Sequence, residues 1–241
     1  MQAAEVRPYW ELLNRKKNQL VIKRFMDITV SAAGLVVMSA PMIAVALYIK
    51  LDSPGPVFFR QERITAYGRR FRIHKFRTMV SNAEGSGSAV TAAGDKRITR
   101  AGSFLRRTKI DELPQLIDVL AGNMSLVGTR PEAPCYVEHY KPVYMATLLL
   151  PAGITSEASL RFLEEEELLR GVSDIDGYYI DNILPVKMIY NLSELKMFSI
   201  ANDIRTIIRT LQAAGGHSRT NLHFPSNTTY DAKNHLSYNK E

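Results

Sequence analysis

Cysteine is almost absent from this chain of 241 residues, which contains only Cys135. A single cysteine forms no internal disulfide, so we expect the folded part of the chain to occupy a reducing compartment. We interpret Cys135 itself as a small buried hydrophobic residue. A zinc site is not expected, because His74 has no second histidine or cysteine at ligand spacing. We assign His74 a surface or packing role.

Acidic residues are scarce in the first part of the chain. Residues 1–130 contain 21 Lys and Arg against 10 Asp and Glu, whereas residues 131–241 contain 10 against 14. A basic region of this kind indicates an anionic partner, and composition leaves open whether that is nucleic acid, a phosphorylated substrate or acidic lipid. We predict no nucleic-acid partner, because the sequence has no recognition helix, aromatic platform or zinc spacing.

Long apolar runs are limited to one, at residues 28–49, which contains no charged side chain. About 20 apolar residues cross a bilayer as a helix, and a soluble helix of this length normally carries a polar face. The run therefore predicts a membrane helix. Residues 1–20 contain no small-residue cleavage site after a short apolar core, so we do not expect a removable signal peptide.

The flanks of this run favour re-entry over a straight crossing. Basic residues stand on both sides of it, although Lys and Arg normally concentrate on the cytoplasmic side of a membrane. Pro41 removes a backbone hydrogen bond and kinks a helix, and Ser39 can cover a carbonyl that the proline frees. We predict a helix that dips into one leaflet and returns to the same face, with a straight span as the alternative.

The remaining patterns predict an α+β fold. Residues 57–64 and 69–79 have the composition of two strands joined in a hairpin around Tyr67 and Gly68. Helical patterns follow at residues 132–150, 157–170 and 200–211. We interpret the acidic run 164–167 as an exposed helix face.

Residues 104–132 contain an acidic pair at the start of an amphipathic helix. Apolar residues recur there at helical spacing, at Leu113, Leu116, Ile117 and Leu120. Pro114 is tolerated only in a first turn, which places Asp111 and Glu112 at or near the helix N-terminus. That end carries partial positive charge, which lowers the pKa of a carboxylate and attracts phosphate.

The spacing of this pair limits its chemistry. Adjacent helical residues point roughly 100° apart, so Asp111 and Glu112 do not face each other across a substrate as glycosidase carboxylates do. One carboxylate attacking phosphorus needs no second carboxylate opposite it, and it gains from nearby cations. Such cations are present in Arg106, Arg107, Lys109 and Arg130. From the residues alone, ordinary capping of the helix N-terminus is the favoured interpretation of the two acids.

Four stretches carry a resemblance to a known family. They are LDSPGPVFFRQERI, FRIHKFRTM, FLRRTKIDELPQLIDVLAGNMSLVGTRPE and PAGIT, in this order after an apolar helix with basic flanks. The combination resembles the bacterial sugar transferases, the monotopic phosphoglycosyl transferases, over about residues 20–211. The resemblance implies a re-entrant membrane helix-hairpin, followed by a small and mainly helical cytoplasmic domain that carries a short β-hairpin.

The resemblance also implies roles for individual residues. Asp111 matches the nucleophile of the family's Asp-Glu dyad, Glu112 its partner, and Arg106 and Arg130 its phosphate-contacting arginines. A magnesium ion (Mg2+) is expected beside Asp111. Three further basic residues are candidates for binding phosphate, namely Arg107, Lys75 and Arg77. For the last two, a solvated strand face is the alternative.

Three departures from the family pattern stand in the sequence. Ala40 precedes Pro41 where the family often has serine, with Ser39 one residue earlier. Thr129 precedes Arg130 where many members have proline. After Ile154 the common glycine-leucine-tryptophan continuation is replaced by an acidic helix, so the sugar is left open.

The implied organisation has four parts. Residues 1–20 form an N-terminal polar segment, residues 21–51 the re-entrant helix, residues 52–214 the catalytic domain and residues 215–241 a disordered tail. A loop is expected at residues 81–95. The implied location is the bacterial inner membrane, with the catalytic domain on the cytoplasmic face and membrane lipid as a partner.

The implied activity is transfer of a sugar 1-phosphate from a UDP-sugar to undecaprenyl phosphate, which initiates a surface glycan. The reaction would pass through a covalent aspartyl-phosphosugar and release UMP. The alternative is a non-catalytic membrane scaffold of the same fold that recruits glycan-assembly enzymes. Retention of Asp111, Glu112, Arg106 and Arg130 argues against it. The sugar, the pathway, the role of the tail and a homodimer are left open.

Overall fold

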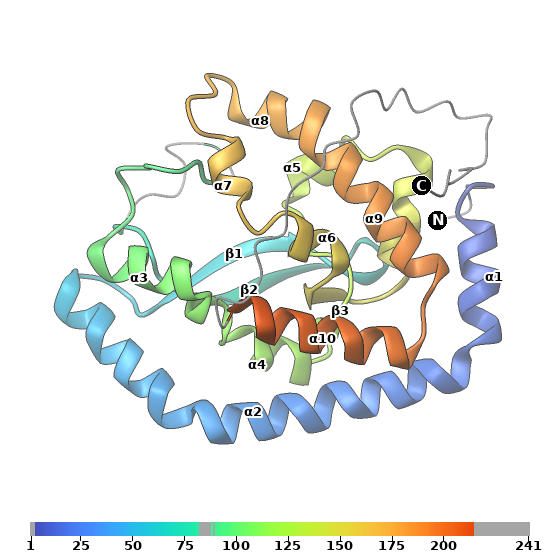
Figure 1. The fold of residues 1–241 in the computed structure, drawn as a ribbon, viewed down its shortest axis with the longest axis horizontal. Helices are drawn as coiled ribbons and strands as arrows, with labels where there is room; N and C mark the ends of the chain where they lie inside the picture. Colours follow the sequence, from blue (N-terminus) through green and yellow to red (C-terminus); the bar gives the residue numbers. More distant parts are fainter. Residues whose placement is uncertain (1–2, 82–87, 89, 215–241) are drawn as a thin grey trace.

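The computed structural model describes residues 3–81, 88 and 90–214. The tail expected from residue 215 and the central part of the loop expected at 81–95 lie outside the described residues. Short helices and short strands alternate with turns through most of the domain, and one long helix borders it (Figure 1). The fold is therefore mixed α and β, as predicted.

The long apolar run forms a single helix, α2 (Lys17–Asp52), which follows α1 (Arg7–Arg15). Among the described residues it is the one helix long and apolar enough to cross a membrane, and only 6% of its most apolar window is buried. Figure 1 shows α2 as one bowed helix along an edge of the domain. The helix is not interrupted at Pro41, which lies inside it. Re-entry into the membrane stays a prediction.

The hydrogen bond that Ser39 makes near Pro41 differs from the expected one. A proline at this position frees the carbonyl of Val37, four residues earlier. The Ser39 hydroxyl instead donates to the carbonyl of Val36 at 2.8 Å. This is the usual back-bond of a helical serine, which reaches the preceding turn more readily than a carbonyl two residues away.

The predicted hairpin is confirmed. Strand β1 (Phe58–Ile64) pairs antiparallel with β2 (Arg70–Phe76), and Gln61 lies opposite Ile73. The short 3-10 helix η1 (Ala66–Gly68) joins them. Tyr67 and Gly68 both have positive φ angles, of 58° and 74°, which reverse the chain within a few residues.

A second sheet was not predicted. Strand β3 (Met124–Val127) pairs in parallel with β4 (Ala152–Thr155), and both strands have four residues. Such short strands, largely buried on both faces, show no alternation of polar and apolar residues. Gly128 and Gly153 meet beside this sheet, where a Cβ atom on Gly153 would lie 2.1 Å from the Gly128 nitrogen. The close approach requires glycine.

The segment between the sheets contains α3 (Arg100–Thr108), the 3-10 helix η2 (Ile110–Glu112) and α4 (Gln115–Leu120). The Thr99 hydroxyl caps α3 by accepting from the backbone nitrogen of Gly102. Pro114 is the N-cap of α4, which agrees with the predicted helix start. The acidic pair thus occupies a tight turn before the helix rather than its first full turn.

Two of the three predicted C-terminal helices are broken. Residues 132–150 form α5 (Pro134–Val137) and the 3-10 helix η3 (Pro142–Leu149), and a proline stands in the first turn of each. Residues 157–170 form α6 (Glu157–Arg161) and α7 (Glu165–Leu168). The third prediction is confirmed by α10 (Ile200–Ala214).

Three further elements lie between α7 and α10. They are α8 (Ile175–Tyr178), the π-helix η4 (Tyr179–Ile183) and α9 (Leu184–Lys196). The main hydrophobic core packs α9 and η4 against α1, α5 and η3, and includes Tyr136, Tyr179 and Met188. The interpretation of Cys135 is wrong, because this residue is exposed. On the four-residue α5, Tyr136 takes the buried position and Cys135 faces outward.

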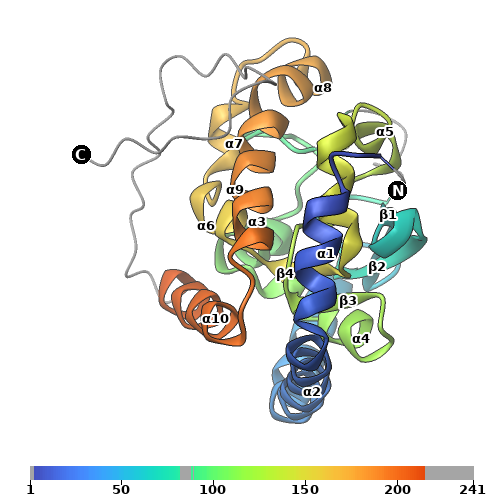
Figure 2. The ribbon, with the colours of Figure 1, turned by 90° about the vertical axis from the view of Figure 1, so that its right-hand side faces the viewer.

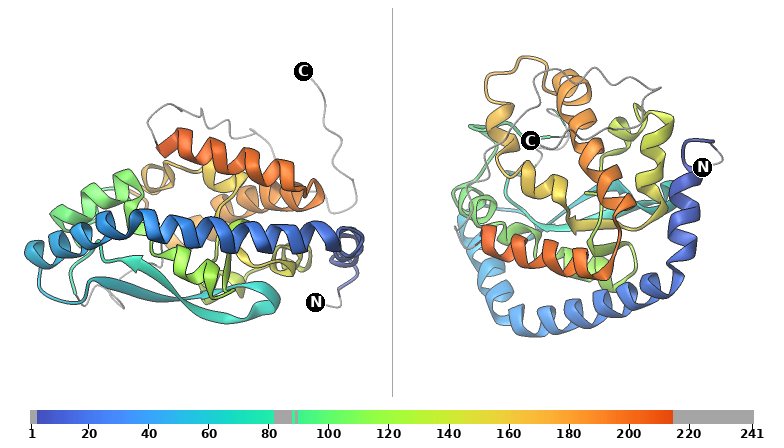
Figure 3. Two further views of the ribbon diagram at one scale, coloured as in Figure 1. Left: turned by 90° about the horizontal axis from the view of Figure 1, so that it is seen from below. Right: turned by 45° about the vertical axis from the view of Figure 1, so that its right-hand side comes forward.

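Helix α2 packs against α4, α3, β3 and α10 of the domain. Figure 2 views α2 nearly end-on below these elements, and Figure 3 shows it between α10 on one side and the β1–β2 hairpin on the other. We call the buried contacts of Lys23, Asp27 and Asp203 the helix junction. There the Lys23 ammonium donates to the Val127 carbonyl at 2.8 Å and to Asp203 at 2.6 Å.

Candidate active site

The acidic pair is positioned by a sharp change of direction after α3. Lys109 adopts a left-handed conformation with φ of 58°, which ends α3 and starts the turn of η2. Asp111 is buried with 6% of its surface exposed. The two acids are adjacent on this turn, so their side chains point in different directions and lie in different surroundings.

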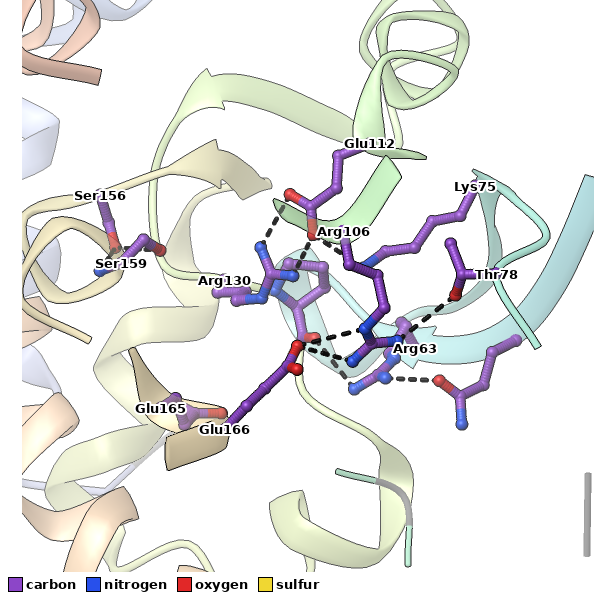
Figure 4. A network of polar contacts seen from close by, with 12 residues as sticks. Arg63, Lys75, Thr78, Arg106, Glu112, Arg130, Ser156, Ser159, Glu165 and Glu166 are labelled. Atoms are coloured by element: carbon purple, nitrogen blue, oxygen red, sulfur yellow. Dashed lines mark hydrogen bonds and ion pairs between the residues drawn. The ribbon is translucent and has the colours of Figure 1, made fainter. Parts of the chain in front are cut away.

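Glu112 is held between two cations. Its carboxylate accepts from the Lys75 ammonium at 2.8 Å and from the Arg130 guanidinium through two contacts, one of 3.1 Å (Figure 4). Burial by itself would raise the pKa of Glu112, but Arg130 and Lys75 outweigh it and hold that pKa well below its usual range. Glu112 is therefore an ionised counter-ion, with no spare proton affinity for a general base.

Asp111 has the opposite electrostatic surroundings. Its Oδ1 atom is buried and has no hydrogen-bond partner among the described residues. Burial raises the pKa of Asp111, Lys75 opposes that rise, and the negative charge of Glu112 adds to it. A buried oxygen without a partner costs free energy, so it marks a place where a ligand or a reacting atom is expected.

Arg106 lies close to this pair but bonds a different acid. Its Nε and Nη2 atoms lie 3.2 and 2.7 Å from Oε1 of Glu166, and Nη1 lies 3.4 Å from the Thr78 hydroxyl. Glu165 pairs with Lys187 at 2.7 Å. The interpretation of residues 164–167 as an exposed face is therefore wrong for these two glutamates, because both point to cations of neighbouring elements.

The other predicted basic residues lie apart from Glu112. The Arg77 guanidinium donates to the carbonyls of Ser53 and Pro54 at 2.7 and 2.8 Å, so it holds the turn that follows α2. Arg107 is exposed on α3. Phosphate binding by these two arginines stays a prediction. The packing role of His74 is confirmed, because its Nδ1 atom lies 2.8 Å from Asp118, which is fully buried.

Sequence reasoning missed Arg63, Thr78 and Glu166. Figure 4 shows all three beside Arg106 and Arg130. Arg63 bonds the Pro131 carbonyl, next to Arg130, at 3.4 Å. Both Arg63 and Thr78 fall within the stretches that carry the family resemblance, which was the available signal. Glu166 had no such signal, because its contact with Arg106 spans 60 residues of sequence.

The residues present fit a magnesium ion shared with a substrate. No group of three or more His, Cys, Asp and Glu side chains that could hold a metal occurs in the part of the chain that the structure describes. Mg²⁺ often takes one or two protein carboxylates together with substrate phosphates and water. The unpartnered oxygen of Asp111 can be such a ligand, whereas Glu112 is already engaged by Lys75 and Arg130.

An unshared carboxylate oxygen lies among paired cations on a domain attached to a long apolar helix, and this arrangement of charges can accept a phosphate group. The comparison with known families agrees: the chain belongs to the bacterial sugar transferase family, whose model matches residues 18–215.

Three relatives illustrate the similarity. The chain is 36% identical to UDP-N-acetylgalactosamine-undecaprenyl-phosphate N-acetylgalactosaminephosphotransferase of Aeromonas hydrophila, over 79% of this chain and 43% of that protein. It is 38% identical to UDP-glucose:undecaprenyl-phosphate glucose-1-phosphate transferase of Caulobacter vibrioides, over 78% and 68%. It is 45% identical to a putative undecaprenyl-phosphate N-acetylgalactosaminyl 1-phosphate transferase of Bacillus subtilis, over 54% and 73%. The chain thus spans less than half of the first relative.

Proposed function

We propose that this chain transfers a sugar 1-phosphate from a UDP-sugar to undecaprenyl phosphate and so initiates a surface glycan. The observation that carries the proposal is the buried, unshared oxygen of Asp111, next to a carboxylate whose charge is already neutralised. The substrate classes come from the names of the Aeromonas and Caulobacter relatives. Those names contain different sugars, so the sugar itself is left for experiment.

Asp111 is the nucleophile of the proposed reaction. Its carboxylate oxygen bonds to the phosphorus that bears the sugar, the bond from that phosphorus to the bridging oxygen breaks, and UMP leaves. The product of this step is a covalent aspartyl-phosphosugar. An oxygen of undecaprenyl phosphate then attacks the same phosphorus, and the bond to Asp111 breaks, which releases the lipid-linked sugar and restores the carboxylate.

The cations have two tasks in this reaction. Lys75 and Arg130 hold Glu112, and together they leave an excess of positive charge beside Asp111 that stabilises the negative charge of a phosphate. We assign Arg106 to the donor's phosphates, as the family resemblance implies. A bound magnesium ion would supply further neutralisation of the diphosphate. Glu112 acts as a positioning residue, because it orients Lys75 and Arg130.

The proposed membrane arrangement places α2 as a re-entrant helix in the inner membrane, with the domain on the cytoplasmic face. Large apolar side chains exposed along α2 support contact with lipid, among them Val36, Val37, Ile43, Leu47 and Leu51. Single cysteines at the two ends of α2 should label from the cytoplasm only. Because Cys135 is exposed, it must first be replaced by serine. Labelling from opposite sides would establish a straight span.

The activity is tested by incubating purified protein with magnesium, undecaprenyl phosphate and a panel of UDP-sugars while UMP is measured. We expect UMP release with at least one donor, and a phosphosugar adduct trapped on the native protein when the lipid is omitted. Asp111→Asn should lower UMP release by at least ~10³-fold and form no adduct. Asp181→Asn, an exposed aspartate on η4, is the matched control and should keep native activity.

The same assay separates the enzyme from a non-catalytic scaffold. A scaffold would release no UMP with any donor and form no adduct, although it would keep the native fold. Native turnover by Asp111→Asn would remove the nucleophile from the proposal.

A further inference from the structure

Arg106, which the proposed function assigns to the donor's phosphates, is already occupied by a carboxylate of this chain. Both Nε and Nη2 of Arg106 bond Oε1 of Glu166, at 3.2 and 2.7 Å. Figure 4 shows Arg106 and Arg130 lying between Glu112 and Glu166, which come from η2 and α7. The same arginine thus binds an acid of this chain and is also the proposed contact of the substrate.

The edge of Arg106 that holds Glu166 carries two N–H donors, Nε and Nη2, and such a pair of donors can also bind a phosphate. A guanidinium group presents paired N–H donors that fit two oxygens of a carboxylate or of a phosphate with similar geometry. These donors of Arg106 cannot serve Glu166 and a phosphate at once. The two anions therefore compete for one set of hydrogen bonds.

The partial exposure of both side chains indicates that the ion pair of Arg106 and Glu166 can open and let another anion bind. The side chains of Arg106 and Glu166 are 21% and 37% exposed. By contrast, the carboxylate side chain of Glu112 is 15% exposed and bonds two cations. An ion pair open to solvent contributes little to stability, so a multiply charged diphosphate can displace one carboxylate from it.

Helix α7 does not depend on the Arg106 contact for its position. Glu165 pairs with Lys187, whose side chain is 4% exposed. The backbone carbonyl of Glu166 accepts from the Ala93 nitrogen at 2.9 Å. These two contacts hold the backbone, so the Glu166 carboxylate can leave Arg106 by rotation of its side chain alone.

We infer, on the basis of the proposed function, that Glu166 is an internal competitor of the donor diphosphate. Its carboxylate occupies Arg106 in the free protein and leaves when the UDP-sugar binds. Glu166 thereby weakens donor binding and sets the donor concentration at which the site fills. The residue determines donor affinity through Arg106 and takes no part in bond making or breaking.

Glu166→Gln tests the inference, because glutamine keeps the size of the side chain and removes its charge. UMP binding to the purified full chain and the KM for the UDP-sugar should both improve, by about two- to five-fold, as expected for loss of a partly exposed ion pair. We expect kcat to be unchanged. Glu167→Gln is the matched control, since Glu167 lies on the same helix and pairs with the exposed Arg170 at 2.8 Å. It should leave UMP affinity at the native value.

A double-mutant cycle isolates the contact from other effects of charge. In an Arg106→Gln background, Glu166→Gln should produce no further change in UMP affinity. A change that persists there, equal tightening in Glu167→Gln, or unchanged or weaker UMP binding in Glu166→Gln would each overturn the inference. Failure of the proposed function is distinguishable, because it appears as absence of UMP release by the native protein, whereas the binding comparison needs no turnover.

Discussion

The helix junction and the candidate active site are two of the regions in the described part of the chain that bury charged side chains. At the junction each named group has a partner: Lys23 donates to Asp203 and to the Val127 carbonyl, and Asp27 accepts from the Leu126 nitrogen at 3.0 Å. Such an arrangement satisfies the groups that burial removes from water. The junction attaches α2 to the domain.

At the candidate active site only one of the two adjacent acids has partners for its buried carboxylate. Glu112 has two cations, as a junction residue would, whereas Asp111 keeps a buried oxygen without a partner among the described residues. The difference teaches that burial and charge do not by themselves mark function. The feature that supports the proposed role of Asp111 is its unpartnered oxygen, which is the one carboxylate oxygen among the buried side-chain atoms that have no partner in the described residues.

The two regions are connected through β3. Its Leu126 and Val127 bond Asp27 and Lys23 of α2, and Arg130 follows three residues after Val127. The segment that anchors the long helix therefore also carries a cation of the site. This continuity places the site at a defined distance from α2, and hence from the membrane in the proposed arrangement.

The largest effect on stability is expected at the junction. Lys23→Met leaves Asp203 buried without its cation and should lower the free energy of unfolding by about 3–5 kcal/mol. Thermal or denaturant unfolding of the detergent-solubilised protein measures it. Lys17→Met, which removes an exposed charge from the same helix, should change stability by less than about 0.5 kcal/mol. Equal effects of the two changes would show that the junction is not energetically distinct.

Glu112→Gln should also lower the free energy of unfolding, by less than Lys23→Met does. It leaves Lys75 and Arg130 close together without their counter-ion, and both are only partly buried. We expect a loss of about 2–3 kcal/mol, less than for a fully buried pair. Glu62→Gln, which breaks an exposed pair with Arg70, should cost under about 1 kcal/mol. A neutral result for Glu112→Gln would contradict its role as counter-ion.

Asp111→Asn should change the free energy of unfolding in the opposite direction and stabilise the fold. Because burial raises the pKa of Asp111, the native state binds its proton more readily than the unfolded chain, and stability falls as pH rises through the folded pKa. Asparagine avoids this cost, so we expect a gain of about 0.5–2 kcal/mol at neutral pH. The gain should disappear at pH values below the unfolded pKa. A destabilised Asp111→Asn protein at neutral pH would argue that Asp111 is structural.

The smallest effect is a displacement of the pH profile of activity. A nucleophilic carboxylate must be ionised, so kcat/KM for the UDP-sugar should fall with decreasing pH. An ordinary aspartate titrates near pH 4. Since burial raises the pKa of Asp111, the acidic limb of the profile should lie above that pH. An acidic limb at or below that value would show that the reacting carboxylate is not shifted upward.

Local signals predicted the elements that depend on neighbours in sequence. The composition of residues 28–49 indicated a long apolar helix, and Tyr67 and Gly68 marked the hairpin turn. Pro114 identified the start of α4 and so placed the acidic pair before it. Prediction failed where pairing is distant: β3 and β4 are four residues each, and neither shows a pattern without the other.

The sequence by itself determined which acids and cations the chain possesses, the turn on which Asp111 and Glu112 lie, and the apolar helix before them. Only the tertiary structure decided which acid is neutralised. Lys75 reaches Glu112 across 37 residues, and Glu166 reaches Arg106 across 60. The physical reason is that the charge state of a buried group depends on partners brought near by packing, which no local pattern contains.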